Sequence, residues 1–304
     1  MQNDIPQRQN RPELIDKIAA SSRAYGVVKM ISQWQSVLAL SAAVLGPFVA
    51  VAYPGAKGWA ALYAGLVLVI DLVFLEPAVR RHQELGAKIQ EAFDTELFGL
   101  PWNSHRCQAK PDPEVIINLA AKFKKREKTD RLMNWYPVAA GSVPIEYGRL
   151  VCQRANMRWD AALRRYYCLF FIVLLVLMVV VSCAVALYLK LEASEIAISL
   201  VLPILPAALK ILRECQKHQD SATVSERTKS MLESIWNRAL NEPVSPEQFR
   251  EESRRLQDEL YDRRKGSPTV PQSLYFWLKP DYERDMRLGS DEMVKDAKAK
   301  LGVS

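Results

Sequence analysis

Four long apolar stretches, separated by polar sequence, dominate the hydrophobic pattern of this chain. They run at about 36–53, 59–75, 166–189 and 196–212. Each has about 17 to 24 residues, and a helix of that length, rising 1.5 Å per residue, crosses a hydrocarbon layer of about 30 Å. Because backbone groups that face lipid must be hydrogen-bonded within their own element, the stretches predict transmembrane helices. Their arrangement in two close pairs predicts two hairpins.

Helix signals also mark the polar segments. Pro12 opens a helix before the first apolar stretch, and Asp112, followed by proline and glutamate, opens another between the two hairpins. Ser245 and Gln248 form a capping box for a helix that extends to about Lys265. No polar segment shows the sustained alternation of a half-buried strand. We therefore predict an all-α integral membrane protein.

The distribution of charge predicts how this protein is oriented. The chain has 41 Lys and Arg against 34 Asp and Glu, a net charge of +7. Beside the apolar stretches, Lys and Arg favour the sides away from the hairpin turns by about 13 to 2, which is the positive-inside pattern. The charge therefore indicates topology, and we expect no DNA or RNA partner. The N-terminus also lacks the apolar core of a signal peptide.

These signals divide the chain into five parts, with both termini and the middle segment in the cytoplasm. The parts are an N-terminal cytoplasmic helix (1–35), transmembrane hairpin 1 (36–75), a cytoplasmic helical insert (76–165), transmembrane hairpin 2 (166–212) and a cytoplasmic helical tail (213–304).

The sequence offers no catalytic set. His82, His105 and His218 are isolated from one another, and the five cysteines have neither metal-binding nor redox spacing. There is also no glycine-rich phosphate loop and no nucleophile elbow. We therefore expect no enzyme activity, no cofactor and no metal site.

Polar residues and prolines within the apolar stretches are the candidates for pore or gating residues. Asp71 lies inside the second stretch, and an ionised carboxylate there must face protein or water. It forms either a buried ion pair with Lys210, which lies at a similar depth, or part of a water-filled pathway. Pro203 and Pro206 predict a bend in the fourth stretch, which in a channel could act as a gate.

Small residues recur at every fourth position of the first hairpin. Ala42 and Gly46 form one such pair, and Ala61 and Gly65 form another. This spacing lets helix backbones approach closely in a membrane. The simplest interpretation is that the first hairpin packs against itself.

Short motifs around the hairpins carry a family resemblance. They are Gln9-Asn10, the segment 93–103 (FDTELFGLPWN), the segment 134–137 (NWYP) and the segment 152–160 (CQRANMRWD). In this order they resemble the SMODS-associated four-transmembrane family of pore-forming effectors. The resemblance implies a bacterial inner-membrane effector of a CBASS anti-phage system, in which a cyclic oligonucleotide made by a neighbouring nucleotidyltransferase activates membrane permeabilisation and abortive infection.

An anionic cyclic nucleotide needs cationic donors and aromatic faces for its bases. We expect residues of the insert to supply them. The alternative is that the tryptophans of the insert belong to its core and that its arginines serve topology. The candidate ligand-binding residues are Trp102, Asn103, Trp135, Tyr136, Arg154, Asn156 and Trp159.

Four spans are too few for one chain to enclose a pore, so we expect a homo-oligomer in the lipid bilayer. The rival function is a non-channel receptor or scaffold that recruits a cytoplasmic partner.

Overall fold

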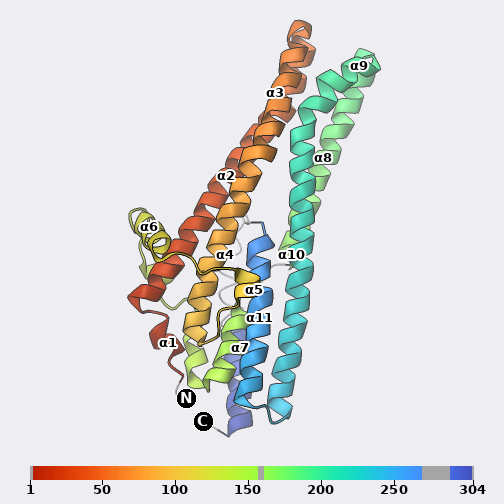
Figure 1. Cartoon of the computed structure of the whole chain (residues 1–304). Helices are drawn as coiled ribbons and strands as arrows, with labels where there is room; N and C mark the ends of the chain where they lie inside the picture. The colour runs from red at the N-terminus through yellow and green to blue at the C-terminus, as the bar shows by residue number, and fades with distance from the viewer. Residues whose placement is uncertain (1–2, 157–160, 269–287, 303–304) are drawn as a thin grey trace. The chain divides into compact units, whose positions relative to one another are not determined.

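The computed structural model describes residues 3–156, 161–268 and 288–302, and every regular element in them is helical. Four helices are long and apolar enough to cross a membrane, which confirms the predicted fold class. The longer elements, shown in Figure 1, are α2 (Pro12–Ala52), α3 (Lys57–Ile70), α4 (Glu76–Phe98), α6 (Pro113–Lys124), α7 (Ile145–Ala155), α8 (Ala161–Leu189), α10 (Leu202–Asn241) and α11 (Pro246–Gly266). The short ones are α1 (Ile5–Arg8), α5 (Ser104–Cys107) and α9 (Ala193–Ile196), with 3-10 turns at Pro54–Ala56, Asp130–Leu132 and Val138–Ser142 and π-helical turns at Asp71–Leu75 and Ala197–Val201.

The described residues form two compact units. We call the unit of residues 27–81 and 162–220 the membrane unit, because it contains the apolar stretches. The unit of residues 1–26, 82–161 and 221–304 is called the helical unit. Each unit is built from segments that are far apart in the sequence, so long-range packing rather than local order defines it.

Within the membrane unit, the helices pair as two hairpins. The hydroxyls of Ser41 and Tyr63 lie 2.7 Å apart and join α2 to α3. The thiol of Cys168 donates to the carbonyl of Cys215 at 3.4 Å and joins α8 to α10. Pro54 starts the 3-10 turn between α2 and α3, because its ring favours the first position of a helical turn.

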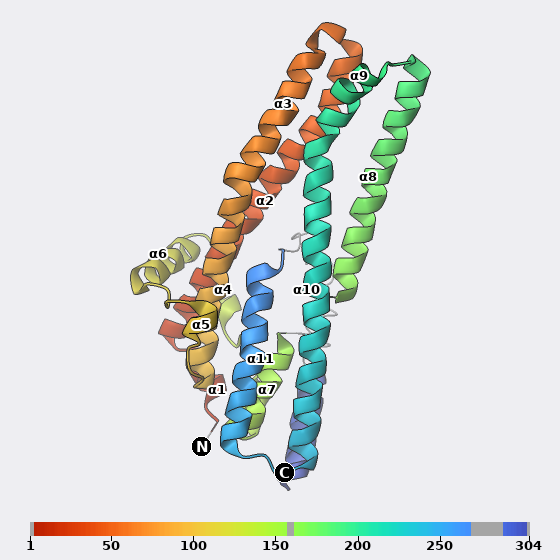
Figure 2. The same ribbon diagram turned by 45° about the vertical axis from the view of Figure 1, so that its right-hand side comes forward.

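Within the helical unit, one hydrophobic core unites the N-terminus, the insert and the tail. α4 contributes Phe93 and Leu97, α7 contributes Leu150, and α11 contributes Leu256 and Leu260, all of them fully buried. Figure 2 shows α11 beside α7 in this unit, and a helix at 288–301 adds Met293 and Ala297 to the same core.

Candidate functional site

A buried carboxylate lies where three helices of the membrane unit meet. Asp71 begins the π-helical turn Asp71–Leu75 and is 7% exposed. Gln35 of α2 donates to Asp71 through Nε2 at 2.7 Å, and Arg213 of α10 pairs with the other carboxylate oxygen. An unpaired charge in lipid costs about 2.5–3.5 kcal/mol. The pairing explains how the carboxylate is tolerated among apolar stretches.

Further ion pairs surround this contact. Glu76 of α4 pairs with Lys217 of α10, which makes a second link between these chain segments. Lys210 pairs with Glu214 at 2.5 Å within α10, and its Nζ lies 3.5 Å from Gln35 Oε1. The partner of Asp71 is thus Arg213 rather than Lys210. We refer to Gln35, Asp71, Glu76, Lys210, Arg213 and Lys217 as the membrane ion network.

The prolines of the fourth apolar stretch lie at a close helix contact. Pro203 and Pro206 are both buried, and the π-helical turn Ala197–Val201 directly precedes them. A Cβ added to Gly46 of α2 would lie 2.6 Å from the Cβ of Pro203, whereas one added to Gly65 would meet nothing within 4 Å. Gly46 therefore packs α2 against α10 and not against its hairpin partner α3.

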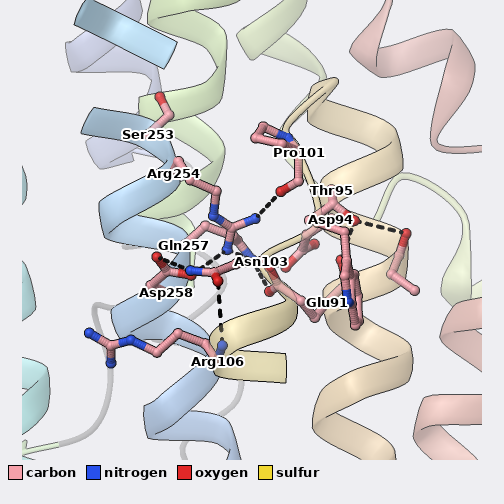
Figure 3. Close-up of polar contacts among 12 residues, drawn as sticks. Glu91, Asp94, Thr95, Pro101, Asn103, Arg106, Ser253, Arg254, Gln257 and Asp258 are labelled. Atoms are coloured by element: carbon pink, nitrogen blue, oxygen red, sulfur yellow. Dashed lines mark hydrogen bonds and ion pairs between the residues drawn. The ribbon is translucent and has the colours of Figure 1, made fainter. Parts of the chain in front are cut away.

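A second polar network lies in the core of the helical unit. Glu91 and Asp94 of α4 are fully buried, and α11 supplies their partners (Figure 3). Arg254 donates to Glu91 at 2.6 Å, and Gln257 Nε2 lies 2.8 Å from an oxygen of each carboxylate. Arg264 pairs with Asp94 at 2.6 Å. Two buried carboxylates are thus matched by two guanidinium groups, as burial of charge requires.

Tyr136 connects this network to the insert. Its hydroxyl donates to Asp94 at 2.6 Å and accepts from Asn156 at 2.7 Å. Burial, together with the nearby charge of Asp94, raises the pKa of Tyr136 well above its usual value, so the phenol is a neutral donor. Burial opposes the charge of Arg264, but Asp94 and other neighbouring groups, Glu91 among them, together outweigh it and hold the pKa of the guanidinium above its usual value. At neutral pH these groups keep fixed protonation states.

Asn103 extends the network to α5. Its side chain caps α5 by accepting from the next backbone N–H groups, and it donates to Asp258 of α11 at 3.0 Å. Asp258 also accepts from Arg254 at 3.0 Å, and Arg254 reaches Glu91 (Figure 3). One continuous chain of hydrogen bonds therefore links Asn103 to Asn156.

The other candidate ligand residues lie elsewhere in the helical unit or outside the described residues. The indole of Trp102 donates to the carbonyl of Gln108 at 2.9 Å, and Trp135 is half-buried against the hydrophobic core. Arg154 donates to the carbonyl of Gly289 at 2.6 Å. Trp159 is not among the described residues. A role of these residues in ligand binding stays a prediction.

The buried carboxylates and their partners were not predicted from the sequence. One signal was available on α11, where Phe249, Leu256 and Leu260 form an apolar stripe. Ser253 and Gln257 follow the same helical spacing and are fully buried, so the stripe continues through polar residues. A polar residue within an apolar stripe indicates a buried hydrogen-bond network.

Metal-binding clusters and reactive cysteines are not found in the described part of the chain. No group of three or more His, Cys, Asp or Glu residues there is arranged to hold a metal ion. Burial raises the pKa of Cys107 to about 12 and that of Cys152 well above its usual value, so neither thiol is activated as a nucleophile.

Comparison with known proteins identifies the family. The model of the SMODS-associating 4TM effector domain matches residues 3–293. A protein of Bacillus cereus (strain VD146), described as a probable CBASS effector molecule, is 25% identical over 203 residues, which cover 65% of this chain and 68% of that protein. No solved structure matches the chain significantly. Because the family match covers both units and all four apolar helices, this multi-pass membrane protein belongs to the SMODS-associating 4TM effector domain family.

Proposed function

We propose that the chain is the membrane-permeabilising effector of a bacterial anti-phage system and that a cyclic oligonucleotide opens it. Membership of an effector family supports the effector role, and the name of the B. cereus relative supports a link to CBASS signalling. In this proposal, a neighbouring nucleotidyltransferase makes the nucleotide during infection. The opened effector then permeabilises the inner membrane and stops growth of the infected cell.

The membrane ion network is the observation that most strongly supports the proposed permeation of the membrane. A simple membrane anchor needs only apolar helices, whereas here Asp71, Arg213 and Gln35 are placed among them. Ion pairs exchange protein partners for water when helices separate, and separated charges would then line a hydrated path. We propose that the Asp71–Arg213 pair stabilises the closed arrangement of α2, α10 and the π-helical turn at Asp71.

Opening also requires assembly and a connection to the ligand. Four apolar helices are too few to enclose a wide path, so we propose a homo-oligomer. α2 and α10 each run without interruption from residues of the helical unit into residues of the membrane unit. A ligand that binds one conformation of the helical unit more tightly would shift the closed–open equilibrium through these helices.

The flanking charges support one orientation of the protein in the membrane. The excess of Lys and Arg on one side of the apolar stretches supports cytoplasmic termini and a cytoplasmic insert at 76–165. This orientation would place the helical unit on the side of the inner membrane where the nucleotide is made. Fusion of reporter enzymes to either terminus tests the orientation, and a periplasmic signal from either fusion would contradict it.

Dye release from liposomes tests the proposed function. The purified full-length protein is reconstituted with a trapped small dye and exposed to a panel of cyclic dinucleotides and trinucleotides. We expect release with one class of cyclic nucleotide and none without ligand. Unconditional release would contradict gating. Nucleotide binding without release would instead support the rival function, a membrane-anchored receptor or scaffold.

A further inference from the structure

Two arginines from different helices contact the C-terminal end of α4, and a third lies near them on α11. The helix ends at Phe98, and Gly99 follows with a φ of 62°. The N–H of Leu100 bonds back to the carbonyl of Thr95 at 2.9 Å, which closes the turn. The other carbonyls at this end need donors from elsewhere. We refer to Arg8 of α1, Arg149 of α7 and Arg250 of α11 as the arginine cluster.

Two members of the arginine cluster are held by α4 itself. Arg8 donates through Nη2 to the carbonyl of Glu96, and Arg149 donates through Nε to the carbonyl of Phe98 at 2.6 Å. These carbonyls are two residues apart, so both guanidinium groups lie at the same helix end. Arg149 is 7% exposed, yet its two terminal nitrogens contact no acceptor among the described residues. A mostly buried cation therefore retains unused donors.

Arg250 lies on α11, on the side of that helix that faces the loop after α4. One turn further along this helix, Arg254 donates to the carbonyl of Pro101 at 2.9 Å (Figure 3). This contact places one side of α11 against the loop that follows α4. Arg250 is exposed and, within the described part of the chain, makes no hydrogen bond or ion pair.

The charge effects on Arg149 agree with this placement of Arg8 and Arg250. Burial most strongly lowers the pKa of Arg149; Glu146 opposes this effect, while the charges of Arg250 and Arg8 lower the pKa further. Asp4 also pairs with Arg8 at 3.4 Å. Three positive charges are thus offset by two carboxylates. The cluster has a surplus positive charge beside an incompletely used guanidinium.

An oxyanion would satisfy both the charge and the free donors. Guanidinium groups form paired, charge-assisted hydrogen bonds with phosphate oxygens, and these bonds are stronger than those between neutral groups. We propose that the arginine cluster binds a phosphate group of the nucleotide signal. The identity of the ligand as a cyclic nucleotide rests on the proposed function, whereas the affinity for phosphate follows from the cluster itself.

Binding of inorganic pyrophosphate to the full-length protein in detergent tests the site directly by calorimetry. Arg250→Ala removes an exposed side chain that makes no hydrogen bond or ion pair among the described residues, so we expect the fold to stay intact, as thermal unfolding will verify. We expect it to weaken binding about tenfold, the value of one charge-assisted hydrogen bond. The matched control is Arg255→Ala, because Arg255 is also exposed on α11 and lacks hydrogen bonds and ion pairs among the described residues. It should bind like the wild type.

Equal affinity in all three proteins, or no binding by the wild type, would overturn the proposal. Arg149→Lys is a second test, because it retains the charge but loses the forked donor, and it should also weaken binding.

A third experiment compares binding to vesicles with and without phosphatidylglycerol. Dependence on Arg250 for vesicle binding but not for pyrophosphate would assign the cluster to lipid headgroups and reject the nucleotide.

The binding assay and the dye-release assay separate this site from the proposed function. Nucleotide-gated release that is unchanged in Arg250→Ala would reject the site and leave the function intact. Pyrophosphate binding that depends on Arg250, without release by any nucleotide, would support the phosphate site and reject the function.

Discussion

At Asp94 in the helical unit, three donors converge on one fully buried carboxylate, namely Tyr136, Gln257 and Arg264. Removing the carboxylate leaves the guanidinium of Arg264 buried without its counter-charge. We expect Asp94→Ala to lower the free energy of unfolding by about 3–5 kcal/mol, the usual cost of breaking a buried ion pair by removing one partner. Chemical denaturation in detergent, monitored by circular dichroism, measures this loss.

Glu96 offers a matched control two residues along the same helix. Its carboxylate pairs with Lys17 but is about half exposed, with a relative side-chain exposure of 52%. Solvent-exposed pairs contribute about 0–1 kcal/mol, so Glu96→Ala should change stability little. If the two substitutions cost the same, the buried network does not stabilise the helical unit as we infer.

At the scale of helices, the two small-residue motifs of the first hairpin make opposite predictions. Gly46→Ala places a Cβ 2.6 Å from the Cβ of Pro203 and forces α2 away from α10. We expect a loss of about 1–3 kcal/mol, as for other overpacked sites. Gly65→Ala meets nothing within 4 Å and should be neutral or stabilising by up to about 1 kcal/mol, because alanine favours helix.

Thermal unfolding of both glycine variants in the same detergent measures this difference. A lower midpoint for Gly65→Ala than for Gly46→Ala would contradict the packing of α2 on α10. It would instead indicate that the exposed face of α3 is a contact surface in the assembled protein.

The helices themselves were predictable, whereas their partners were not. Apolar stretches and capping residues are local signals, so the four membrane helices and α11 follow directly from the sequence. The ion-pair partner of Asp71 could not be predicted from these local signals. The sequence places Lys210 at the same depth, but the structure pairs Asp71 with Arg213, three residues away on the helix. Hydropathy gives depth in a membrane but not the angle at which a side chain leaves its helix.

The buried carboxylates show the same limit over longer separations. Glu91 and Arg254 are 163 residues apart, and an acid on a charged helix has no local mark of burial. Asn103, Tyr136 and Asn156 were expected as candidate ligand-binding residues, and that role stays a prediction. The sequence did not indicate that one hydrogen-bond network joins them, because that requires the fold of α4 against α11.

At the scale of the whole molecule, each unit has its own set of buried ion pairs, and the two sets differ in what they join. In the helical unit, the pairs lie within a large hydrophobic core and are matched charge for charge. In the membrane unit, Asp71–Arg213 and the neighbouring pair Glu76–Lys217 join helices that also pack through small residues, such as Ala39, Ala43 and Ala207. Contacts between small residues stabilise an interface weakly, so these ion pairs make a large part of the difference between packed and separated helices. This unit is therefore the better candidate for the moving part.

Asp71→Asn tests whether that ion pair holds the effector closed. Asparagine retains the size of the side chain and its contact with Gln35, but it removes the charge opposite Arg213. We expect dye release from liposomes without any nucleotide, because the closed arrangement loses a stabilising interaction that the open one lacks. The matched control is Glu214→Gln, which breaks the pair with Lys210 inside α10 and leaves the link between helices in place. If Asp71→Asn lowers stability but release still requires the nucleotide, the pair only packs the helices, and the gate lies elsewhere.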